Sequence, residues 1–377
     1  MPNGPVARGS TPTPSYRAGV IGLGWMGLLH DIAVGGDRGR YEVDDVDRPT
    51  PELDVHRRFY AHDGPGPQNV PHTWAQVLWD RPEVQLVAAA ERDSTRLDAF
   101  GRRYHSESLY SDAQDMLRNE SLDIVAIATN TKGRADLTGL AVECGVKAIA
   151  TEKPMAHRLD EADRMVQACG DAGVPLLCGA TPLNHPAFAK AKQLLHDGAI
   201  GDLLSIEASA PKAQKQYWSY FVDDAPAWVV GHGDAPRRDT GSDEFAGQGV
   251  MVTAGGLAVH FRKGAPTLRL SGSAGEIVFG TPGLQLWQDI DTPGGTHRAQ
   301  VPWPAPGLAP GYNAVYGLAD LIACLEGRLD EPKNSGRRVA IALEVEIALK
   351  QSAANNAARI EMPLKDRALG LYYDWFR

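Results

Sequence analysis

Short apolar runs alternate with amphipathic stretches over the first half of the chain. Each run is bounded by polar or glycine-containing segments and so predicts a buried strand; the runs are 18–21, 84–90, 122–128, 146–150 and 174–178. Apolar residues three and four positions apart predict helices between them, at 94–104, 134–144 and 159–172. Strands that alternate with helices are typical of a parallel sheet covered on both faces, so we expect a doubly wound α/β domain.

After residue 181 the pattern changes to β-like runs separated by glycine-rich turns. A helix is expected at 186–196, and the runs follow at 203–208, 228–230, 257–261, 267–270 and 276–279. No helical periodicity separates these runs, which favours a largely antiparallel open sheet. Two further helices are expected at 314–326 and 337–354.

With 377 residues the chain exceeds the usual size of one hydrophobic core, so two domains are expected. The pattern divides the chain into a flexible Pro/Gly/Ser/Thr-rich tail at 1–15, a doubly wound domain at 16–180 and an α+β domain at 181–377. The α+β domain is the candidate for substrate binding and oligomerisation.

A segment at about 36–82 is too long for a simple connection before the second strand. It is interpreted either as a surface insertion or oligomer contact, or as a lid over the site. Trp74 and Trp79 lie at near-helical spacing, which indicates that part of the segment packs.

Composition and charge exclude several classes of function. The net charge of −9 repels a phosphate backbone and no block of basic residues reverses it locally, so nucleic acid is not an expected partner. No apolar stretch is long enough for a membrane span. The tail lacks the apolar core of a secretory signal, and the four cysteines form no C-x-x-C pair. These features favour a soluble cytoplasmic protein without a zinc site.

A glycine motif directly follows the first predicted strand and opens a helix that is expected to run to about Val34. Its residues are Gly22, Leu23, Gly24, Trp25, Met26 and Gly27. In G-x-G-x-x-G the glycines permit a tight turn, close approach to a pyrophosphate and close packing of helix on strand. The helix amino terminus favours the phosphate charge, so a Rossmann dinucleotide site is predicted.

The second predicted strand runs into Glu91 and Arg92. A carboxylate at this place is expected to accept hydrogen bonds from the adenosine ribose and to repel a 2′-phosphate, which favours NAD. Arg92 leaves NADP possible, because a guanidinium pairs well with phosphate.

The fifth predicted strand runs into Thr151-Glu152-Lys153-Pro154-Met155-Ala156. Together with the glycine motif upstream, this sequence resembles the E-K-P motif of the glucose–fructose oxidoreductase/inositol dehydrogenase family, Gfo/Idh/MocA. Further similar segments are 122–129, 161–163, 186–188 and 198–201, so the resemblance spans nearly the whole chain.

The resemblance implies a role for each residue near the nicotinamide. It places Lys153 between the substrate hydroxyl and the nicotinamide ribose, and it implies a cis bond before Pro154. Glu152, Thr129 and Asn130 would line the nicotinamide end of the site. Family members commonly pair through the open face of the second sheet, so the resemblance also implies a homodimer or homotetramer.

The sequence departs from the family pattern around the substrate. Typical members carry D-x-G-x-H-x-x-D in the second domain, and none of the eleven histidines here lies in that motif. The segment 179–186 stands where the family often has an Asn-Arg pair, and Arg134 stands where a histidine often follows the fourth strand. Reaction type is therefore harder to predict than cofactor binding.

Lys153 and His185 are the catalytic candidates. His185 follows the sixth predicted strand, and an imidazole suits proton transfer near neutrality. The alternative is that His185 caps the helix that begins at Pro186 or bonds a backbone carbonyl. Substrate contacts are expected from Arg134, Asn184, Trp218 and Tyr220, although alternating aromatic residues such as the last two are also common in a sheet core.

The first hypothesis is an NAD(P)-dependent oxidoreductase that transfers hydride between nicotinamide and a secondary alcohol or ketone of a sugar, cyclitol or related polyol. The absence of the histidine motif leaves two alternatives. One is an enzyme that retains NAD for redox-neutral elimination, glycoside cleavage or epimerisation, and the other is a non-catalytic sensor of dinucleotide or sugar.

Overall fold

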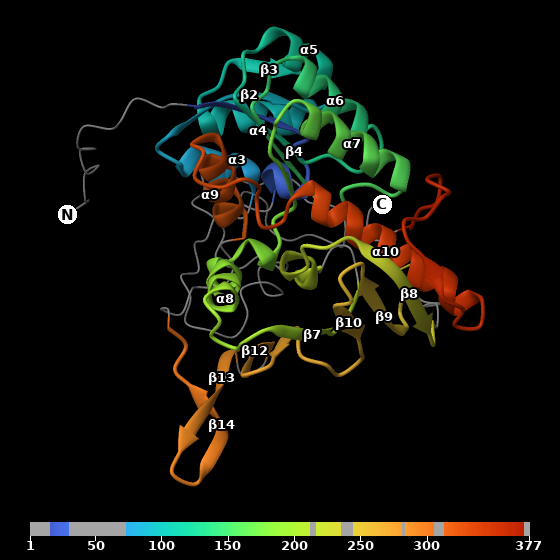
Figure 1. Cartoon of the computed structure of the whole chain (residues 1–377). Coiled ribbons are helices and arrows are strands. Elements are labelled where there is room, and N and C mark those ends of the chain that lie inside the picture. The colour runs from blue at the N-terminus through green and yellow to red at the C-terminus, as the bar shows by residue number, and fades with distance from the viewer. Residues whose placement is uncertain are drawn as a thin grey trace, which may run out of the picture.

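The chain folds around two sheets with a long helix between them. The computed structural model describes residues 16–29, 73–211, 216–234, 244–280, 283–304 and 313–372. Figure 1 shows the helix α10 (Gly336–Ala354) crossing the middle of the molecule between the sheets. It packs on β8 (Pro226–His232) of one sheet and on β6 (Leu176–Cys178) of the other.

The first sheet has six strands, all parallel, in the order β3-β2-β1-β4-β5-β6. Besides β6, its strands are β1 (Tyr16–Ile21), β2 (Val84–Ala90), β3 (Ser108–Tyr110), β4 (Ile124–Ile127) and β5 (Ala148–Thr151). This is the strand order of a dinucleotide-binding Rossmann domain, in which ligands bind at the carboxyl ends of the strands where the order reverses. Here that point lies between β1 and β4.

Helices cover both faces of this sheet, as the doubly wound pattern predicts. One face packs against η1 (Trp25–Leu29), α3 (Trp74–Asp80), α4 (Ser94–Tyr104) and α9 (Asn313–Leu325). The other face packs against α5 (Ala113–Asn119), α6 (Arg134–Glu143) and α7 (Leu159–Asp171). The helix α9 therefore returns from the far part of the chain to complete the first domain.

The second sheet has nine strands in the order β14-β13-β12-β11-β7-β10-β9-β8-β15. Its pairs are antiparallel except for β7 with β10, which confirms the largely antiparallel sheet. Besides β8, its strands are β7 (Leu203–Ala208), β9 (Gln248–Thr253), β10 (Ala258–Phe261), β11 (Leu268–Gly272), β12 (Gly275–Gly280), β13 (Gly283–Thr292), β14 (Gly295–Val301) and β15 (Ile360–Glu361). Three short helices lead into it: η2 (Pro182–Asn184), α8 (Pro186–His196) and η3 (Tyr217–Phe221).

The residues after β15 connect the two domains. The carbonyl oxygens of Leu369 and Arg367 accept the backbone N–H groups of Leu159 and Asp160, in the first turn of α7. These N–H groups have no partner within the helix, so the returning segment serves as the helix cap. The Arg367 side chain also donates to Asp163 on α7 and to Glu344 on α10.

The predicted fold is confirmed, and the differences concern element boundaries and missed elements. The helices α4 and α8 and the strands β2 and β7 have the predicted limits. Weakly patterned elements were not predicted; they are β3, α5, β9, β13, β14 and β15. Of the segment at 36–82, residues 36–72 lie outside the described residues, whereas α3 is helical and packed, as the spacing of Trp74 and Trp79 indicates. Residues 30–34 of the helix expected after the glycine motif also lie outside them.

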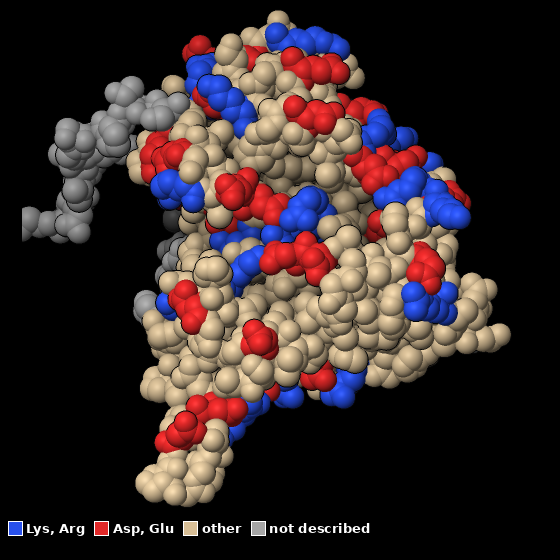
Figure 2. Space-filling view, viewed as in Figure 1, with Lys and Arg blue, Asp and Glu red and all other residues tan. Residues whose placement is uncertain are grey.

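No helix in the described residues has the length and apolarity of a membrane-crossing segment. On the face shown in Figure 2, acidic and basic side chains are interspersed over both domains. Exposed charged side chains of the described residues form ion pairs, such as Arg158 with Asp160 and Arg328 with Glu326.

Candidate functional site

The glycine turn has a backbone that only glycine adopts easily. Gly22 has a φ of +87°, and a Cβ there would lie 3.0 Å from Thr129 in the loop after β4. A Cβ on Gly27 would lie 1.9 Å from the Gly22 carbonyl oxygen, so this contact also requires glycine. A Cβ on Gly24, in contrast, would meet no atom of the described residues within 4 Å, so among them the surface of the turn is open there. The turn therefore fits a ligand that approaches the backbone at Gly24, as a dinucleotide pyrophosphate does.

The three residues between the glycines differ in burial. Leu23 is fully buried in the core beneath the turn, whereas Trp25 and Met26 are half-buried. The N–H groups of Leu28 and Leu29 both donate to the Gly24 carbonyl oxygen, at 3.0 and 3.1 Å, which begins the helix directly after the turn.

Glu91 ties the end of β2 to the glycine turn. One carboxylate oxygen accepts the N–H of Leu23 at 2.6 Å, and the other accepts the N–H groups of Arg92 and Asp93. A carboxylate has about four acceptor sites, so Glu91 keeps capacity for a ribose hydroxyl beside the turn. The Arg92 side chain is exposed at the same place.

Arg134 connects the two loops at the predicted nicotinamide end. Its side chain is fully buried, and its guanidinium donates to the carbonyl oxygens of Thr129, Glu152, Pro154 and Met155. Burial lowers the pKa of Arg134 to about 10, which leaves the group cationic near neutrality. The guanidinium therefore fixes the loop after β4 against the loop after β5. The substrate contact expected of Arg134 stays a prediction, and the observed contacts are those of a positioning residue.

The E-K-P loop follows β5 at the carboxyl edge of the sheet. The peptide bond between Lys153 and Pro154 is cis, as the resemblance implies. Glu152 is buried, and its carboxylate accepts the N–H groups of Lys153 and Ala180 and the indole N–H of Trp74. Lys153 is half-buried beside Gly179, where an added Cβ would lie 3.3 Å from the lysine Cβ.

The loop after β4 lies beside both the glycine turn and the E-K-P loop. Thr129 is half-buried and its hydroxyl donates to the carbonyl oxygen of Asn130, which is exposed. The ends of β1, β4 and β5 therefore bring Gly22, Thr129 and Lys153 to one edge of the sheet. Their assignment to a cofactor site stays a prediction.

His185 caps α8. Its Nδ1 accepts the N–H of Ala187 at 3.2 Å, and its ring packs edge-on against Tyr316. An Nδ1 that accepts carries no proton, so in the neutral ring the proton is on Nε2. This arrangement corresponds to the capping alternative, because a base acting through Nε2 would have to move that proton and lose the cap. The adjacent Asn184 is fully buried and its amide donates to the carbonyl oxygens of Gly179 and Asn313.

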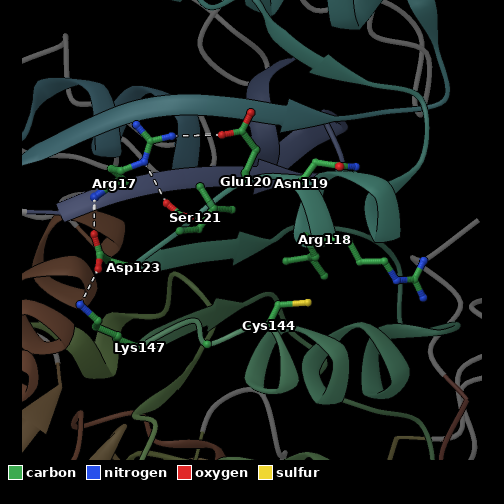
Figure 3. A pocket seen from close by; sticks show the side chains of 11 residues that line it. Arg17, Arg118, Asn119, Glu120, Ser121, Asp123, Cys144 and Lys147 are labelled. Carbon is green, nitrogen blue, oxygen red and sulfur yellow. Dashed lines mark hydrogen bonds and ion pairs between the residues drawn. The ribbon is translucent and has the colours of Figure 1, made fainter.

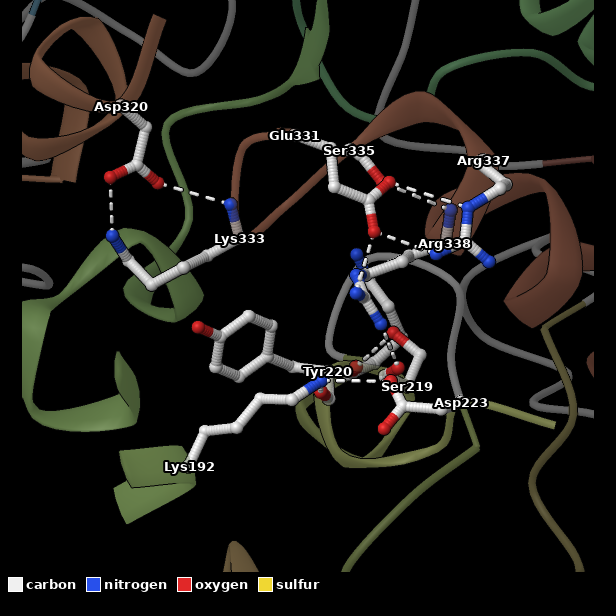
Figure 4. Close-up of polar contacts among 11 residues, drawn as sticks. Lys192, Ser219, Tyr220, Asp223, Asp320, Glu331, Lys333, Ser335, Arg337 and Arg338 are labelled. Carbon is white, nitrogen blue, oxygen red and sulfur yellow. Dashed lines mark hydrogen bonds and ion pairs between the residues drawn. The ribbon is translucent and has the colours of Figure 1, made fainter. Parts of the chain in front are cut away.

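The two predicted aromatic substrate residues lie in η3. Trp218 is fully buried and packs edge-on against Phe261 of the sheet, which is the core alternative. Tyr220 is half-buried between Lys192 and Arg338, whose cationic groups lie 5.0 and 5.3 Å from the ring centre. Figure 4 shows the tyrosine within a network that also contains Glu331, which pairs with Arg338. Burial raises the pKa of Tyr220 to about 12, so its hydroxyl stays protonated near neutrality.

Two residues that connect elements near the site were not predicted. Trp74 reaches Glu152 from α3, and the only sequence feature that pointed to it was its spacing from Trp79. Asn334, just before α10, donates to the Cys178 carbonyl oxygen and accepts from Gln216. Ser335 is the N-cap of α10, and its side chain accepts the N–H of Arg338.

A separate hollow lies at the opposite edge of the Rossmann sheet. It has a volume of about 540 Å³, and Figure 3 shows Arg17, Asp123 and Lys147 on its wall. These groups pair with one another, since Asp123 accepts the Arg17 N–H and binds Lys147 at 2.8 Å. Asp123 and Lys147 precede β4 and β5, so the hollow is remote from the carboxyl edge. Among the described residues no cluster of three His, Cys, Asp or Glu side chains could hold a metal ion.

The strand order is that of the Rossmann class, and the glycine turn has a geometry that fits a dinucleotide. Residues 69–180 match the model of the oxidoreductase family with an NAD-binding Rossmann fold, Gfo/Idh/MocA. The match covers less than half of the chain, and it is residues 69–180 that are similar to this family. The match begins beyond the glycine turn, so the turn and the family match are separate observations.

Curated relatives are similar over about a third or more of the chain. D-apiose dehydrogenase of Paraburkholderia graminis is 41% identical over 130 residues, which are 34% of this chain and 33% of the relative. Levoglucosan dehydrogenase of Pseudarthrobacter phenanthrenivorans is 30% identical over 152 residues, 40% of this chain and 38% of the relative. The aligned segments thus span little more than a third of these relatives.

The likeness to solved structures extends over both domains. An oxidoreductase from Agrobacterium radiobacter, solved with NAD+, L-tartaric acid and magnesium, superposes with a TM-score of 0.62 at 16% identity. The superposition covers 92% of this chain and 98% of the other. At this identity the likeness establishes the two-domain fold alone.

Proposed function

We propose that the protein is an NAD(P)-dependent oxidoreductase that transfers hydride between nicotinamide and a secondary alcohol or ketone of a sugar, cyclitol or related polyol. The observation that carries the proposal is that the glycine turn and Lys153 lie at the same edge of the sheet, joined by the loop after β4. Relatives that match about a third or more of the chain are named for the sugars D-apiose and levoglucosan, which supports the substrate class.

The proposed cofactor is NAD, held by the turn from Gly22 to Gly27. The carboxylate of Glu91 supports NAD over NADP, because a 2′-phosphate beside it would be repelled. Exposed Arg92 beside this carboxylate keeps NADP possible. Thr129, Asn130 and Glu152 would lie toward the nicotinamide end.

When bound, the nicotinamide ring supplies the acceptor or donor of the hydride. A lysine ammonium has three N–H donors, so Lys153 can orient the substrate oxygen and stabilise negative charge that develops on it. Arg134 would act indirectly, since its guanidinium holds the backbone on both sides of Lys153. This scheme assigns no proton transfer to His185, whose Nδ1 accepts the N–H that caps α8.

A redox-neutral enzyme that retains NAD is the second candidate. It is supported by the absence of the D-x-G-x-H-x-x-D motif, whose histidine accepts the substrate proton in typical family dehydrogenases. A sensor that binds dinucleotide or sugar without turnover is the third.

Calorimetry with NAD and NADP, followed by a panel of aldoses, cyclitols and anhydrosugars, separates these candidates. Sustained change of absorbance at the nicotinamide band is expected for the first. Product without net cofactor reduction would favour the second, and tight binding without turnover would favour the sensor. Well-folded protein that gives no heat with either coenzyme, oxidised or reduced, would contradict all of them.

We also propose that two copies pair through the outer face of the nine-stranded sheet, as a homodimer or within a homotetramer. Trp228 and Val252 are register partners on one face, as are Val230 and Val250, and together they form an apolar strip across β8 and β9. Light scattering after size exclusion tests the mass, and Val250→Glu with Val252→Glu should yield monomers. A monomeric wild-type protein would contradict the proposal.

A further inference from the structure

Trp74 joins α3 to the E-K-P loop. It is the first residue of α3, and the side chain of Thr73 caps that helix by accepting the N–H of Gln76. The indole is 1% exposed and belongs to the core cluster between the Rossmann sheet and α9. The position of its ring is therefore fixed by packing on several sides.

The indole N–H of Trp74 donates to Glu152 Oε1 at 2.9 Å. The same oxygen accepts the N–H of Ala180 at 3.2 Å, and Oε2 accepts the N–H of Lys153 at 3.1 Å. One buried carboxylate thus joins α3 to the backbone at the ends of β5 and β6. Because Glu152 is only 4% exposed, water cannot readily replace a donor that is removed.

The backbone that the carboxylate holds has little room to shift. A Cβ on Gly179 would lie 3.3 Å from both the backbone N and the Cβ of Lys153, so the ends of β5 and β6 are already close. A carboxylate that reorients after losing a donor would change the hydrogen bonds to Lys153 and Ala180. The direction of the lysine side chain follows from that backbone.

We propose that Trp74 is a positioning residue that acts through Glu152 on Lys153. The inference deepens the proposed function and rests on it for the role of Lys153 in turnover. The inference also applies to the protein without cofactor, because the indole N–H would influence the position of the lysine amine there as well.

The test compares Trp74→Phe with Trp79→Phe. Phenylalanine keeps an aromatic ring in the core and removes the N–H. Trp79 lies on the same helix, is 39% exposed, and packs against Tyr104 with ring centres 5.5 Å apart, so it is a matched control. Two quantities are measured: turnover, and the rate at which an amine-acylating reagent labels Lys153 in the cofactor-free protein, read by mass spectrometry.

For Trp74→Phe we expect kcat to fall about tenfold, with KM for the coenzyme changed less than about twofold. The labelling rate of Lys153 should change by at least about threefold, which corresponds to roughly 0.65 kcal/mol. Trp79→Phe should match wild type in both measurements. Unchanged Lys153 labelling in Trp74→Phe would overturn the inference.

Glu152→Gln tests the route of the effect and provides a second variant if Trp74→Phe folds poorly. If Trp74 acts through Glu152, the double variant should change Lys153 labelling no more than the larger single variant does. Additive effects would overturn the inference. Because labelling needs no coenzyme and no substrate, the result stands even if the proposed enzyme activity is not found.

Discussion

The two halves of the candidate site are built in different ways. In the cofactor half, the function follows from backbone geometry, such as the positive φ of Gly22 and the close contact of Gly27 with Gly22. In the substrate half, two of the predicted residues have structural roles: His185 caps a helix and Trp218 is buried in the core. Sequence motifs identify the first kind of site well, because the backbone shape itself requires the residue type. The chemistry of the second kind depends on neighbours that are distant in sequence.

The largest expected effect is that of Lys153→Ala. If the lysine orients the substrate oxygen, turnover should be abolished, whereas affinity for NAD should stay within about tenfold, or about 1.4 kcal/mol. Steady-state kinetics and calorimetry with NAD measure the two quantities.

Lys190→Ala is the control for this variant, since Lys190 lies on α8 and contacts Gln193 by a surface hydrogen bond. It should behave as wild type. Turnover that persists in Lys153→Ala would show that the lysine is not part of the mechanism.

Gly24→Ala and Gly27→Ala should separate ligand binding from folding within the glycine turn. A Cβ on Gly24 meets only open space, so Gly24→Ala should keep its melting temperature and bind NAD at least about tenfold more weakly, through crowding of the pyrophosphate. A Cβ on Gly27 would collide with the Gly22 carbonyl oxygen, so Gly27→Ala should lose several kcal/mol of unfolding free energy, on the order of an overpacked core.

Thermal melts measure the stability of the two variants, and calorimetry measures their affinity for NAD. NAD affinity at the wild-type level in Gly24→Ala would show that the open surface of the turn is not where the pyrophosphate binds.

The sequence predicted the fold well where long periodic segments or special backbone positions carry the pattern. The helix α4 and the strand β2 have the limits expected, and the sequence predicted the cis bond before Pro154 by resemblance. Short elements such as β3 were missed because three residues carry no periodicity. In the candidate site, Trp74 was missed because its hydrogen-bond partner Glu152 lies 78 residues away. A local sequence pattern cannot predict a hydrogen bond between residues so far apart in the chain.

Variants of His185 test whether this residue has a structural or a catalytic role in the substrate half. Asparagine is a good N-cap, so His185→Asn should keep both the unfolding free energy and turnover, whereas His185→Ala should lose about 1 kcal/mol of stability. Urea unfolding and steady-state kinetics measure the two variants. Turnover could instead fall a hundredfold or more in His185→Asn while stability is unchanged. A loss of that size is typical of removing a general base, and it would return His185 to the catalytic candidates.

The smallest expected effect concerns His157, which lies where the E-K-P loop leads into α7. Its Nε2 is 3.1 Å from the Thr131 hydroxyl, and its carbonyl oxygen accepts the N–H of Leu371. Burial lowers the pKa of His157, and the charge of Arg134 acts in the same direction. The folded protein therefore keeps this imidazole neutral at a pH where the unfolded chain takes up a proton.

The unfolding free energy should consequently fall as the pH drops through about 6.5, the ordinary pKa of histidine, toward the lower pKa of the folded state. His157→Gln should flatten this part of the pH dependence, measured by urea unfolding between about pH 7.5 and about pH 5.5. His297, exposed on the β13–β14 hairpin, provides the control, and His297→Gln should leave the slope as in wild type. Equal slopes in all three proteins would contradict this prediction. His157 would then make no pH-dependent contribution to the unfolding free energy.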